Sequence, residues 1–464
     1  VLIKKLLILF LFIGIAFSCK KDKEVDSDVT FLSGLIVNPE LDYVIFSKGN
    51  QVLDTVPLDS KNFFFYKTDK ITEEGLFIFR HNETQVFFAE PGDSLILHLN
   101  TMDFDKSLNY SGRGAEKNNL LMTLFLANVE ENKNLPKWYT LSPEEFTEEI
   151  DSLKLNKEIE FKDFLSRNKE VSPAFKAVAR TAINYDYYSK KELYGTANKN
   201  RLGDLGPDFY SYRDNIDFEN EDLRLYYPYY RFMIRFFDNL VVSKHPFGIN
   251  RNSYEFNIDR LHAIDSLAKG DSIRNSLTRI TALRYFYHAK DKKNQENFLA
   301  QFKQYNNNPR HIEEIEELSQ YAMKLSNGKI VPDVSLLTME NTNVMLHDVI
   351  KRPTVLYFWS SESSEQGRVI HRRAAELKSK YPEYDFIGIN SDSHFRKWRT
   401  KVEQEKYDPK MEYQLENPVT SEKVFVLGNI SKVIIIDTDK TILDGNNNMF
   451  NPEFEQLLLG YLNR

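Results

Sequence analysis

The spacing of apolar residues changes character twice along the chain. Residues 29–100 alternate short apolar runs, such as "TFLSGLIV" and "GLFIFRH", with turn-forming stretches such as "NPE" and "EPGDS". Runs of strand length separated by Gly, Pro and Asn are typical of an all-β domain. Further on, the apolar positions take helical spacing instead. The pattern therefore predicts a β-sandwich domain over residues 29–114 and an α-helical domain over residues 115–326.

Three helix N-termini can be located in the middle of the chain. Ser142, Ser172 and Asn308 each stand immediately before a proline. A small polar residue at the N-cap followed by proline favours a helix start, because the first helical position has no N–H bond to make. Ser142 is also followed three residues later by Glu145, which predicts a capping box.

The last third of the chain alternates strands and helices. The apolar run "TVLYFW" at residues 354–359 favours a buried strand. A helical pattern over residues 364–380, the strand "YDFIGIN", the hairpin "KVIIIDTDKTIL" and the helix "NPEFEQLLLGYL" follow. This alternation predicts an α/β domain over residues 327–464. The predicted fold class is therefore multidomain α+β, with an N-terminal β-sandwich, an α-helical middle and a C-terminal α/β domain.

The first residues depart from globular composition. Lys4 and Lys5 precede the apolar run "LLILFLFIGIAF", which is typical of a secretory signal. The alternative is a transmembrane anchor, but the run is shorter than the roughly 20 residues that span a bilayer. The tetrad "AFSC" resembles a bacterial lipobox. The resemblance implies a lipoprotein signal peptide at residues 1–18, a lipid-modified Cys19 that begins a polar tether (residues 19–28), and a place in the cell envelope, facing the periplasm or on the outer-membrane surface.

Composition and charge narrow the classes of partner. Hydrophobic residues make up 41% of the chain and charged residues 28%, as in an ordinary globular protein, while aromatic residues reach 13%. The formal net charge is -7, and no long basic run is present. Nucleic acids need clustered Lys and Arg to neutralise their phosphates. The chain is therefore not expected to bind nucleic acid.

The stretch "FWSSESSEQGR", residues 358–368, joins the predicted buried strand to a predicted helix. With "VPD" before it and "IIIDTDKTIL" after it, residues 327–464 resemble the TlpA/ResA-type thioredoxin-like domain of membrane-anchored bacterial thiol-disulfide oxidoreductases. The segments "EPGDS" and "YSGRGAE" resemble a β domain of unknown function that often precedes such domains. A second interpretation of "SGRGAEKN" is a phosphate loop, but the Gly-Lys-Ser/Thr ending is missing.

The resemblance implies the positions of a former active site. Aligned on the aromatic pair that ends in Trp359, the two cysteine positions of the family fall at Ser363 and Gln366, and its cis-proline falls at Ser431. The acidic position after the second cysteine falls at Val369. Exchange needs a thiolate that attacks a sulfur, and these residues supply neither. Dithiol catalysis is therefore not expected, and the enzyme activity that the family implies, in disulfide reduction or cytochrome maturation, is kept as the alternative.

Other chemistry has little support in the sequence. Ser363 as a nucleophile would need a base, and His371 lies eight residues on, roughly 12 Å along a helix. The nine histidines are scattered, without the spacing of a metal site. The stretch "DTDKTILDG" begins like a calcium loop, but Ile442 and Asn448 occupy its Gly and Glu positions. No cofactor, metal or catalytic residue is expected.

The predicted function is that of an extracytoplasmic, lipid-anchored protein whose redox-inactive thioredoxin-like domain binds a polypeptide or another partner. A domain that serves only as a spacer is one alternative. A surface glycan-binding lipoprotein is another, because "LYYPYYRFMIRFF" could present Tyr226, Tyr229 and Tyr230 to sugars. The plainer interpretation of that stretch is a core helix, since aromatic rings bury large areas.

Overall fold

The computed structural model describes residues 29–245, 248–361, 363–428 and 431–463. The predicted signal peptide, the tether and Cys19 lie outside these ranges. The chain divides into two compact units, residues 1–239 and 240–464. The division falls within the predicted helical middle, and the predicted boundaries after residues 114 and 326 stay predictions. Within the described ranges, no helix combines the length and the apolar character that crossing a membrane would require.

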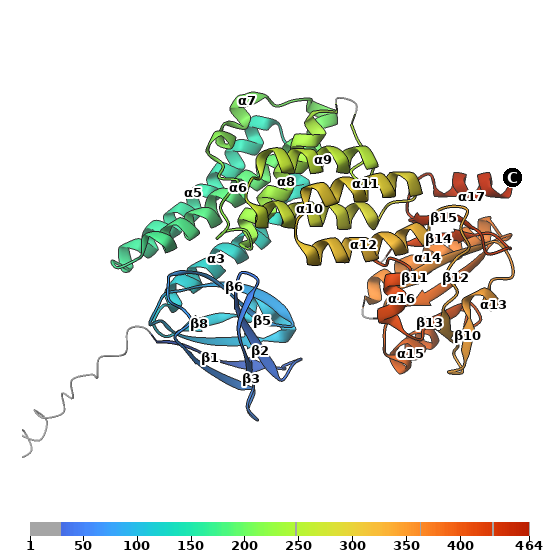
Figure 1. Ribbon diagram of the computed structural model, residues 1–464, viewed down its shortest axis with the longest axis horizontal. Helices are drawn as coiled ribbons and strands as arrows, with labels where there is room; N and C mark the ends of the chain where they lie inside the picture. Colours follow the sequence, from blue (N-terminus) through green and yellow to red (C-terminus); the bar gives the residue numbers. More distant parts are fainter. Residues whose placement is uncertain (1–28, 246–247, 362, 429–430, 464) are drawn as a thin grey trace, which may run out of the picture. The chain divides into compact units, whose positions relative to one another are not determined.

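The first unit opens with two four-stranded sheets (Figure 1). Their orders are β4-β1-β7-β8 and β3-β2-β5-β6, with β1 and β7 parallel and the other neighbours antiparallel. The strands are β1 (Thr30–Val37), β2 (Tyr43–Lys48), β3 (Gln51–Pro57), β4 (Phe63–Thr68), β5 (Gly75–His81), β6 (Glu83–Ala89), β7 (Ser94–Asn100) and β8 (Asn109–Ser111).

Aromatic side chains fill the core between these two sheets. Alternate residues of β4 are buried, so that Phe64 and Tyr66 point inward while their neighbours are exposed. Phe46 of β2 stacks on Tyr66, with ring centroids 5.3 Å apart, and lies 5.8 Å from both Phe64 and Phe79. The alternation of apolar and polar residues that predicted strands therefore also determines which aromatic rings are buried between the two sheets.

Helices complete the first unit. A 3-10 turn (Thr101–Asp103), α2 (Phe104–Ser107) and α4 (Leu135–Trp138) are short, whereas α3 (Ala115–Asn132), α5 (Pro143–Arg167) and α6 (Pro173–Leu202) are long. After α7 (Gly206–Phe209) and a second 3-10 turn (Ser211–Asn215), α8 (Tyr227–Ser243) leads into the second unit. The capping box before α5 is confirmed, because the Glu145 N–H donates to Ser142 Oγ at 3.2 Å and the Ser142 N–H donates to Glu145 Oε2 at 3.0 Å.

The stretch "SGRGAEKNN" connects strand β8 to helix α3. A Cβ on Gly112 would lie 2.1 Å from the Ser94 carbonyl oxygen, and Gly112 has a φ of +92°, so this turn requires glycine. Beyond it, the Asn118 side chain donates to the Phe88 carbonyl at 2.8 Å and accepts from the Phe88 N–H at 2.7 Å. Asn119 makes the same pair of bonds to the backbone of Tyr110, at 2.8 and 2.9 Å. The motif thus attaches α3 to β6 and β8, which accounts for it without a phosphate.

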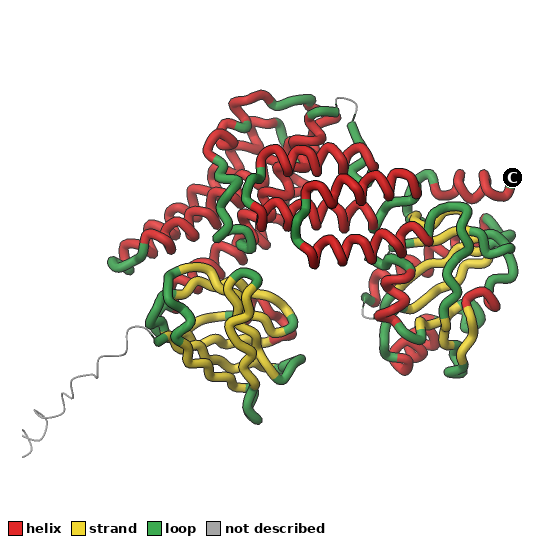
Figure 2. The backbone as a smooth tube through the Cα atoms, viewed as in Figure 1, coloured by secondary structure: helices red, strands yellow, loops and turns green. Residues whose placement is uncertain are grey.

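Among its described residues, the second unit has four helices ahead of a seven-stranded sheet and five further helices along that sheet. The first four helices are α9 (Tyr254–Leu267), α10 (Asp271–Phe286), α11 (Lys292–Tyr305) and α12 (Pro309–Lys324). The sheet order is β10-β9-β13-β12-β11-β14-β15, and Figure 2 shows its strands in yellow. The strands are β9 (Ser335–Leu337), β10 (Asn343–Met345), β11 (Thr354–Trp359), β12 (Asp385–Asn390), β13 (Glu412–Leu415), β14 (Val433–Ile436) and β15 (Ile442–Asn447). The later helices are α13 (Leu346–Val349), α14 (Ser364–Lys380), α15 (Phe395–Glu405), α16 (Pro418–Val424) and α17 (Phe454–Leu462).

The pairing of the central strands is that of a thioredoxin-like sheet, as the resemblance implied. Strand β11 runs parallel to β12 and antiparallel to β14, and β14 and β15 form the late hairpin. One face of β11 contributes Leu356 and Phe358 to a core that also contains Phe286, Phe298 and Phe302 of the preceding helices. The other face packs on α14 and α17. Because α10 and α11 share a core with the sheet, they belong to the same compact unit as the α/β part.

We predict that Asn118→Leu lowers the free energy of unfolding by about 1–3 kcal/mol, because it leaves the buried N–H and C=O of Phe88 without their partners. Chemical denaturation followed by circular dichroism measures the loss. Thr123→Leu, at an exposed position on the same helix, is the control and should be nearly neutral. Equal effects of the two changes would contradict the proposed attachment of α3 to the sheet.

Candidate functional site

The predicted active-site positions lie at one end of the central strand. Strand β11 ends at Trp359, and Ser363 is the N-cap residue of α14, with the Gly367 N–H donating to its carbonyl at 3.0 Å. Gln366 lies in the first turn of that helix. Ser431 comes two residues before Val433, which pairs with Tyr357 of β11. Because β11 and β14 are antiparallel, Ser431 lies toward the end of β11 that carries Trp359. The topology therefore gathers all four positions at this end of the sheet.

A buried carboxylate lies beneath the loop. Glu412, at the start of β13, is 2% exposed. Its Oε2 accepts from the Nε1–H of Trp359 at 2.9 Å, and its Oε1 accepts from the hydroxyl of Tyr357 at 2.9 Å. Burial, together with this neighbouring carboxylate, raises the pKa of the Tyr357 hydroxyl well above its usual value, so the phenol stays protonated and remains a donor.

His371 of α14 completes this group. Its Nε2 lies 3.0 Å from Glu412 Oε1 and its Nδ1 lies 2.6 Å from the Gly367 carbonyl oxygen. Both ring nitrogens thus face oxygen atoms. The ring also stacks on Tyr407, with centroids 3.5 Å apart and an interplanar angle of 5°. No ring nitrogen is left to deprotonate Ser363.

One glycine makes room for the carboxylate. A Cβ added to Gly388 of β12 would lie 2.4 Å from Glu412 Oε1. A side chain there would push the carboxylate away from its three donors. Neither Glu412 nor Gly388 was singled out from the sequence, because no motif connects residues so far apart along the chain. The one signal that could have identified Glu412 is a charged residue at the start of a buried strand.

Asp392 holds the first residues of the loop. Its carboxylate accepts from Ser360 Oγ at 2.6 Å, from the Ser361 N–H at 2.5 Å and from the side-chain amide of Asn390 at 3.0 Å. Gln414 of β13 in turn donates to Asn390 Oδ1 at 3.0 Å. Asp392 therefore holds Ser360 and Ser361, the two residues that follow Trp359.

A cavity of about 230 Å³ opens beside the loop. Burial, and secondarily the charge of Asp392, raises the pKa of the Glu422 carboxyl. The cavity thus offers apolar, hydroxyl and acidic groups but no thiol. It is lined by Phe358, Trp359, Ser360, Ser391, Asp392, Glu422 and Leu427.

A buried lysine follows Ser431. Lys432 is 3% exposed, and its Nζ donates to the Val426 carbonyl at 3.4 Å. Burial lowers the pKa of its amine to about 7, although the charge of Asp444 opposes the shift. Asp444 also binds Lys290, at 2.9 Å. The residue after the position that the resemblance assigns to a cis-proline is therefore a buried amine whose pKa is lowered toward neutrality.

The aromatic stretch of α8 forms core rather than an exposed sugar platform. Tyr229 is fully buried and its hydroxyl donates to the Asp217 carbonyl at 2.6 Å. A sugar could not stack on it without displacing the helix. Tyr226 is also buried and Tyr230 is half-buried. The plainer interpretation of this stretch holds for Tyr226 and Tyr229.

Acidic and histidine side chains do not gather into a metal site. Within the described ranges, no group of three His, Cys, Asp or Glu side chains could hold an ion.

Comparisons with known proteins find only partial likeness. No protein-family model matches the chain, and no curated protein sequence does. A proposed thiol-disulfide oxidoreductase from Bacteroides vulgatus is 20% identical, covers 30% of this chain and 97% of its own, and gives a TM-score of 0.27. A proposed thiol:disulfide interchange protein DsbE from Chlorobium tepidum is 19% identical over 30% of this chain and 98% of its own, with a TM-score of 0.25. A thiol:disulfide interchange protein from a Bacteroides species is 15% identical over 31% and 93%, with a TM-score of 0.25.

We predict that Glu412→Gln lowers the free energy of unfolding by about 1–3 kcal/mol, because an amide NH₂ would face a group that donates to the carboxylate. Urea unfolding followed by far-ultraviolet circular dichroism measures the loss. Glu403→Gln, at an exposed position of α15, is the control. A loss no larger than that of the control would show that the loop does not depend on this carboxylate.

Lys432→Met should stabilise the protein, and more so at low pH. Below the folded pKa of about 7 the amine is charged in both states, so folding carries the full cost of burying the charge. Between pH 7 and the unfolded pKa near 10.5 the folded amine is neutral, and the cost falls as pH rises. We expect a gain of roughly 1–3 kcal/mol at pH 6 that shrinks toward pH 10.

Thermal unfolding of the wild type and the Lys432→Met variant at pH 6, 8 and 10 measures this difference. Lys351→Met, at an exposed position, should show no such trend. A gain that grows with pH would have the wrong sign for a buried charged amine.

Proposed function

We propose that the protein is an extracytoplasmic, lipid-anchored binding protein whose thioredoxin-like part has kept the shape of an active-site loop and lost its redox chemistry. The bound partner is a polypeptide in extended conformation. Its backbone pairs beside the loop, and one of its side chains enters the cavity between Ser360 and Leu427.

One observation carries the proposal: Trp359, Ser360 and Ser361 before the helix and His371 within it are hydrogen-bonded to carboxyl groups, although the positions that the resemblance assigns to the cysteines carry no sulfur. Ser363 and Gln366 offer no thiolate, yet Glu412 and Asp392 together accept hydrogen bonds from both sides of the loop. Buried polar networks of this kind fix one geometry. A fixed loop next to a cavity serves recognition, since backbone pairing with an extended chain needs no cysteine.

Anchoring is part of the same proposal. Cys19 is the single cysteine of the chain, and a lipid on its sulfur would leave the processed protein without a thiol. Mass spectrometry of the processed N-terminus tests the anchor, and an unmodified, internal Cys19 would contradict it.

The alternative, a thiol-disulfide oxidoreductase, makes a different prediction in a redox assay. We expect no turnover of insulin by the wild type, because exchange requires a thiolate and a second sulfur. Ser363→Cys with Gln366→Cys should form a disulfide, because an N-cap residue and the residue three positions later lie about one helical turn apart, within the Cα separation of about 4.4–6.8 Å that a disulfide spans. Its reductase activity should stay weak, since Ser431 and Val369 do not supply the groups that the family places around the disulfide.

Disulfide mapping of the oxidised double variant, with the two single variants as controls, reads out the pairing. Two cysteines that stay unpaired would overturn the alignment of this loop, and insulin turnover by the wild type would overturn the proposal of a redox-inactive protein.

Binding at the cavity is tested by photo-crosslinking in the cell envelope. A benzoylphenylalanine at Leu427, which lines the cavity, should capture a polypeptide. The same probe at Arg399, on the exposed face of α15, should not. Equal capture at both positions, or none at Leu427, would count against the cavity as the binding site.

A further inference from the structure

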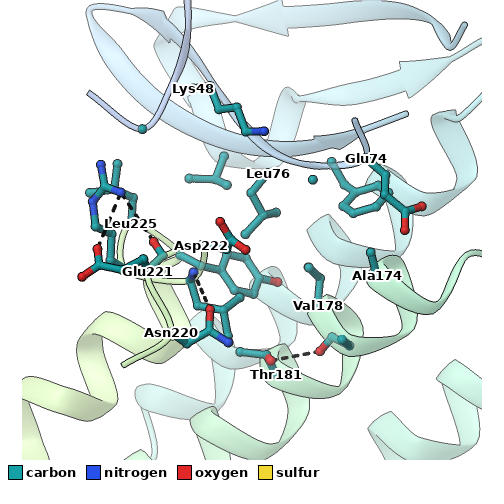
Figure 3. A pocket seen from close by; sticks show the side chains of 18 of the residues that line it. Lys48, Glu74, Leu76, Ala174, Val178, Thr181, Asn220, Glu221, Asp222 and Leu225 are labelled. Atoms are coloured by element: carbon teal, nitrogen blue, oxygen red, sulfur yellow. Dashed lines mark hydrogen bonds and ion pairs between the residues drawn. The ribbon is translucent and has the colours of Figure 1, made fainter. Parts of the chain in front are cut away.

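A second and larger cavity lies wholly within the first unit. Its volume is about 460 Å³, within the range of small-molecule sites. Residues of β5 and β6 form one wall, α6 forms another, and the loop of residues 220–226 closes the side (Figure 3). Nothing in the proposed function uses this cavity.

The floor of the cavity is apolar. Leu76 and Val86 of the sheet face Val178 of α6 across it, and these residues belong to the core that includes Phe88 and Phe175. Ala174 and Ala177 also line it, and their small side chains leave space where larger ones would fill it. An alkyl or other apolar group would therefore gain free energy by entering, because it leaves water for an apolar surface.

One largely buried tyrosine lines this space. Tyr226 lines the cavity and is 7% exposed. Burial is the one cause that raises the pKa of its phenol, and its hydroxyl has no hydrogen-bond partner among the described residues. A polar atom of a ligand would supply one.

The charges around the mouth are unbalanced. Lys48 pairs with Glu73, and Arg224 lies 4.0 Å from Glu221. Glu74 and Asp222 also line the cavity, and neither has an ion-pair partner among the described residues. Figure 3 shows the two on different sides of the cavity, with Leu76 and Val178 between them. The opening of the cavity therefore carries two carboxylates that are not neutralised by an ion pair, above an apolar floor.

We propose that this cavity binds an alkyl amine: an ammonium or guanidinium group on an apolar chain. The chain lies on Leu76, Val86 and Val178, the cation is attracted by Glu74 and Asp222, and an N–H of the ligand donates to the Tyr226 hydroxyl. Two sources share this chemistry, a free amine or the side chain of a lysine or arginine in a polypeptide.

The test uses 1,5-diaminopentane as the probe and isothermal titration of the purified chain. The diamine should bind about tenfold more tightly than 1,5-pentanediol, which has the same length without charge, and 0.5 M salt should weaken it. Asp222→Asn and Glu74→Gln should each weaken binding about twofold to fivefold. Glu83→Gln, an exposed carboxylate that does not line the cavity, should leave binding unchanged.

Tyr226→Phe tests the buried hydroxyl and should weaken binding about twofold to tenfold. If this variant does not fold, the exposed changes at Asp222 and Glu74 still decide the result. Equal affinity for the diol and the diamine overturns the proposal. So does an Asp222→Asn variant that binds like the Glu83→Gln control.

The source of the amine is identified with a lysine capped at both ends by acetyl and methylamide groups. Binding as tight as that of the diamine supports a polypeptide side chain as the ligand. Clearly tighter binding of the diamine supports a free amine. Binding of neither overturns the proposal, and the polypeptide partner proposed for the loop of the second unit would stand unaffected.

Discussion

Three side chains form hydrogen bonds with the carboxyl group of Glu412, and the end of the central sheet is arranged around these bonds. The carboxylate joins β13, where it originates, to Tyr357 and Trp359 of β11 and to His371 of α14. A buried charge is tolerated only when it is paired and fully hydrogen-bonded. The strand end and the first turns of the helix must therefore keep their relative positions, and Gly388 must stay small to admit the carboxylate. These contacts do not depend on cysteines.

Loop geometry and thiol chemistry depend on different residues. Thiol exchange needs particular atoms, namely a thiolate and a second sulfur. The loop geometry needs only the buried carboxylates and their donors. A chain without the sulfur atoms can still keep the loop geometry, because different residues determine the two. At this end of the sheet a small cavity with acidic lining lies beside Ser360, whose hydroxyl donates to Asp392.

The helical middle has two roles, since its residues divide between the two units. Helices α3 and α6 close one side of the β-sandwich and leave the larger cavity beside Leu76 and Val178. Helices α10 and α11 instead complete the core on one face of the seven-stranded sheet, where Phe286 and Phe298 meet residues of β11. A stretch that has a single helical composition thus serves two cores. Which helix joins which core depends on complementary surfaces, which composition does not encode.

Local signals in the sequence were sufficient for several features. The alternation in residues 29–100 indicated the sandwich strands, the Ser-Pro and Asn-Pro pairs located helix starts, and the run ending in Trp359 indicated a buried strand. Each depends on residues within one turn or one strand of each other. The tertiary structure alone decided the rest: that Glu412 meets His371, that Tyr226 is left with an unpaired hydroxyl, and that α10 packs on the sheet. These features join residues distant along the chain, and their energies depend on burial and on which donors face which acceptors, which exist only once the chain has folded.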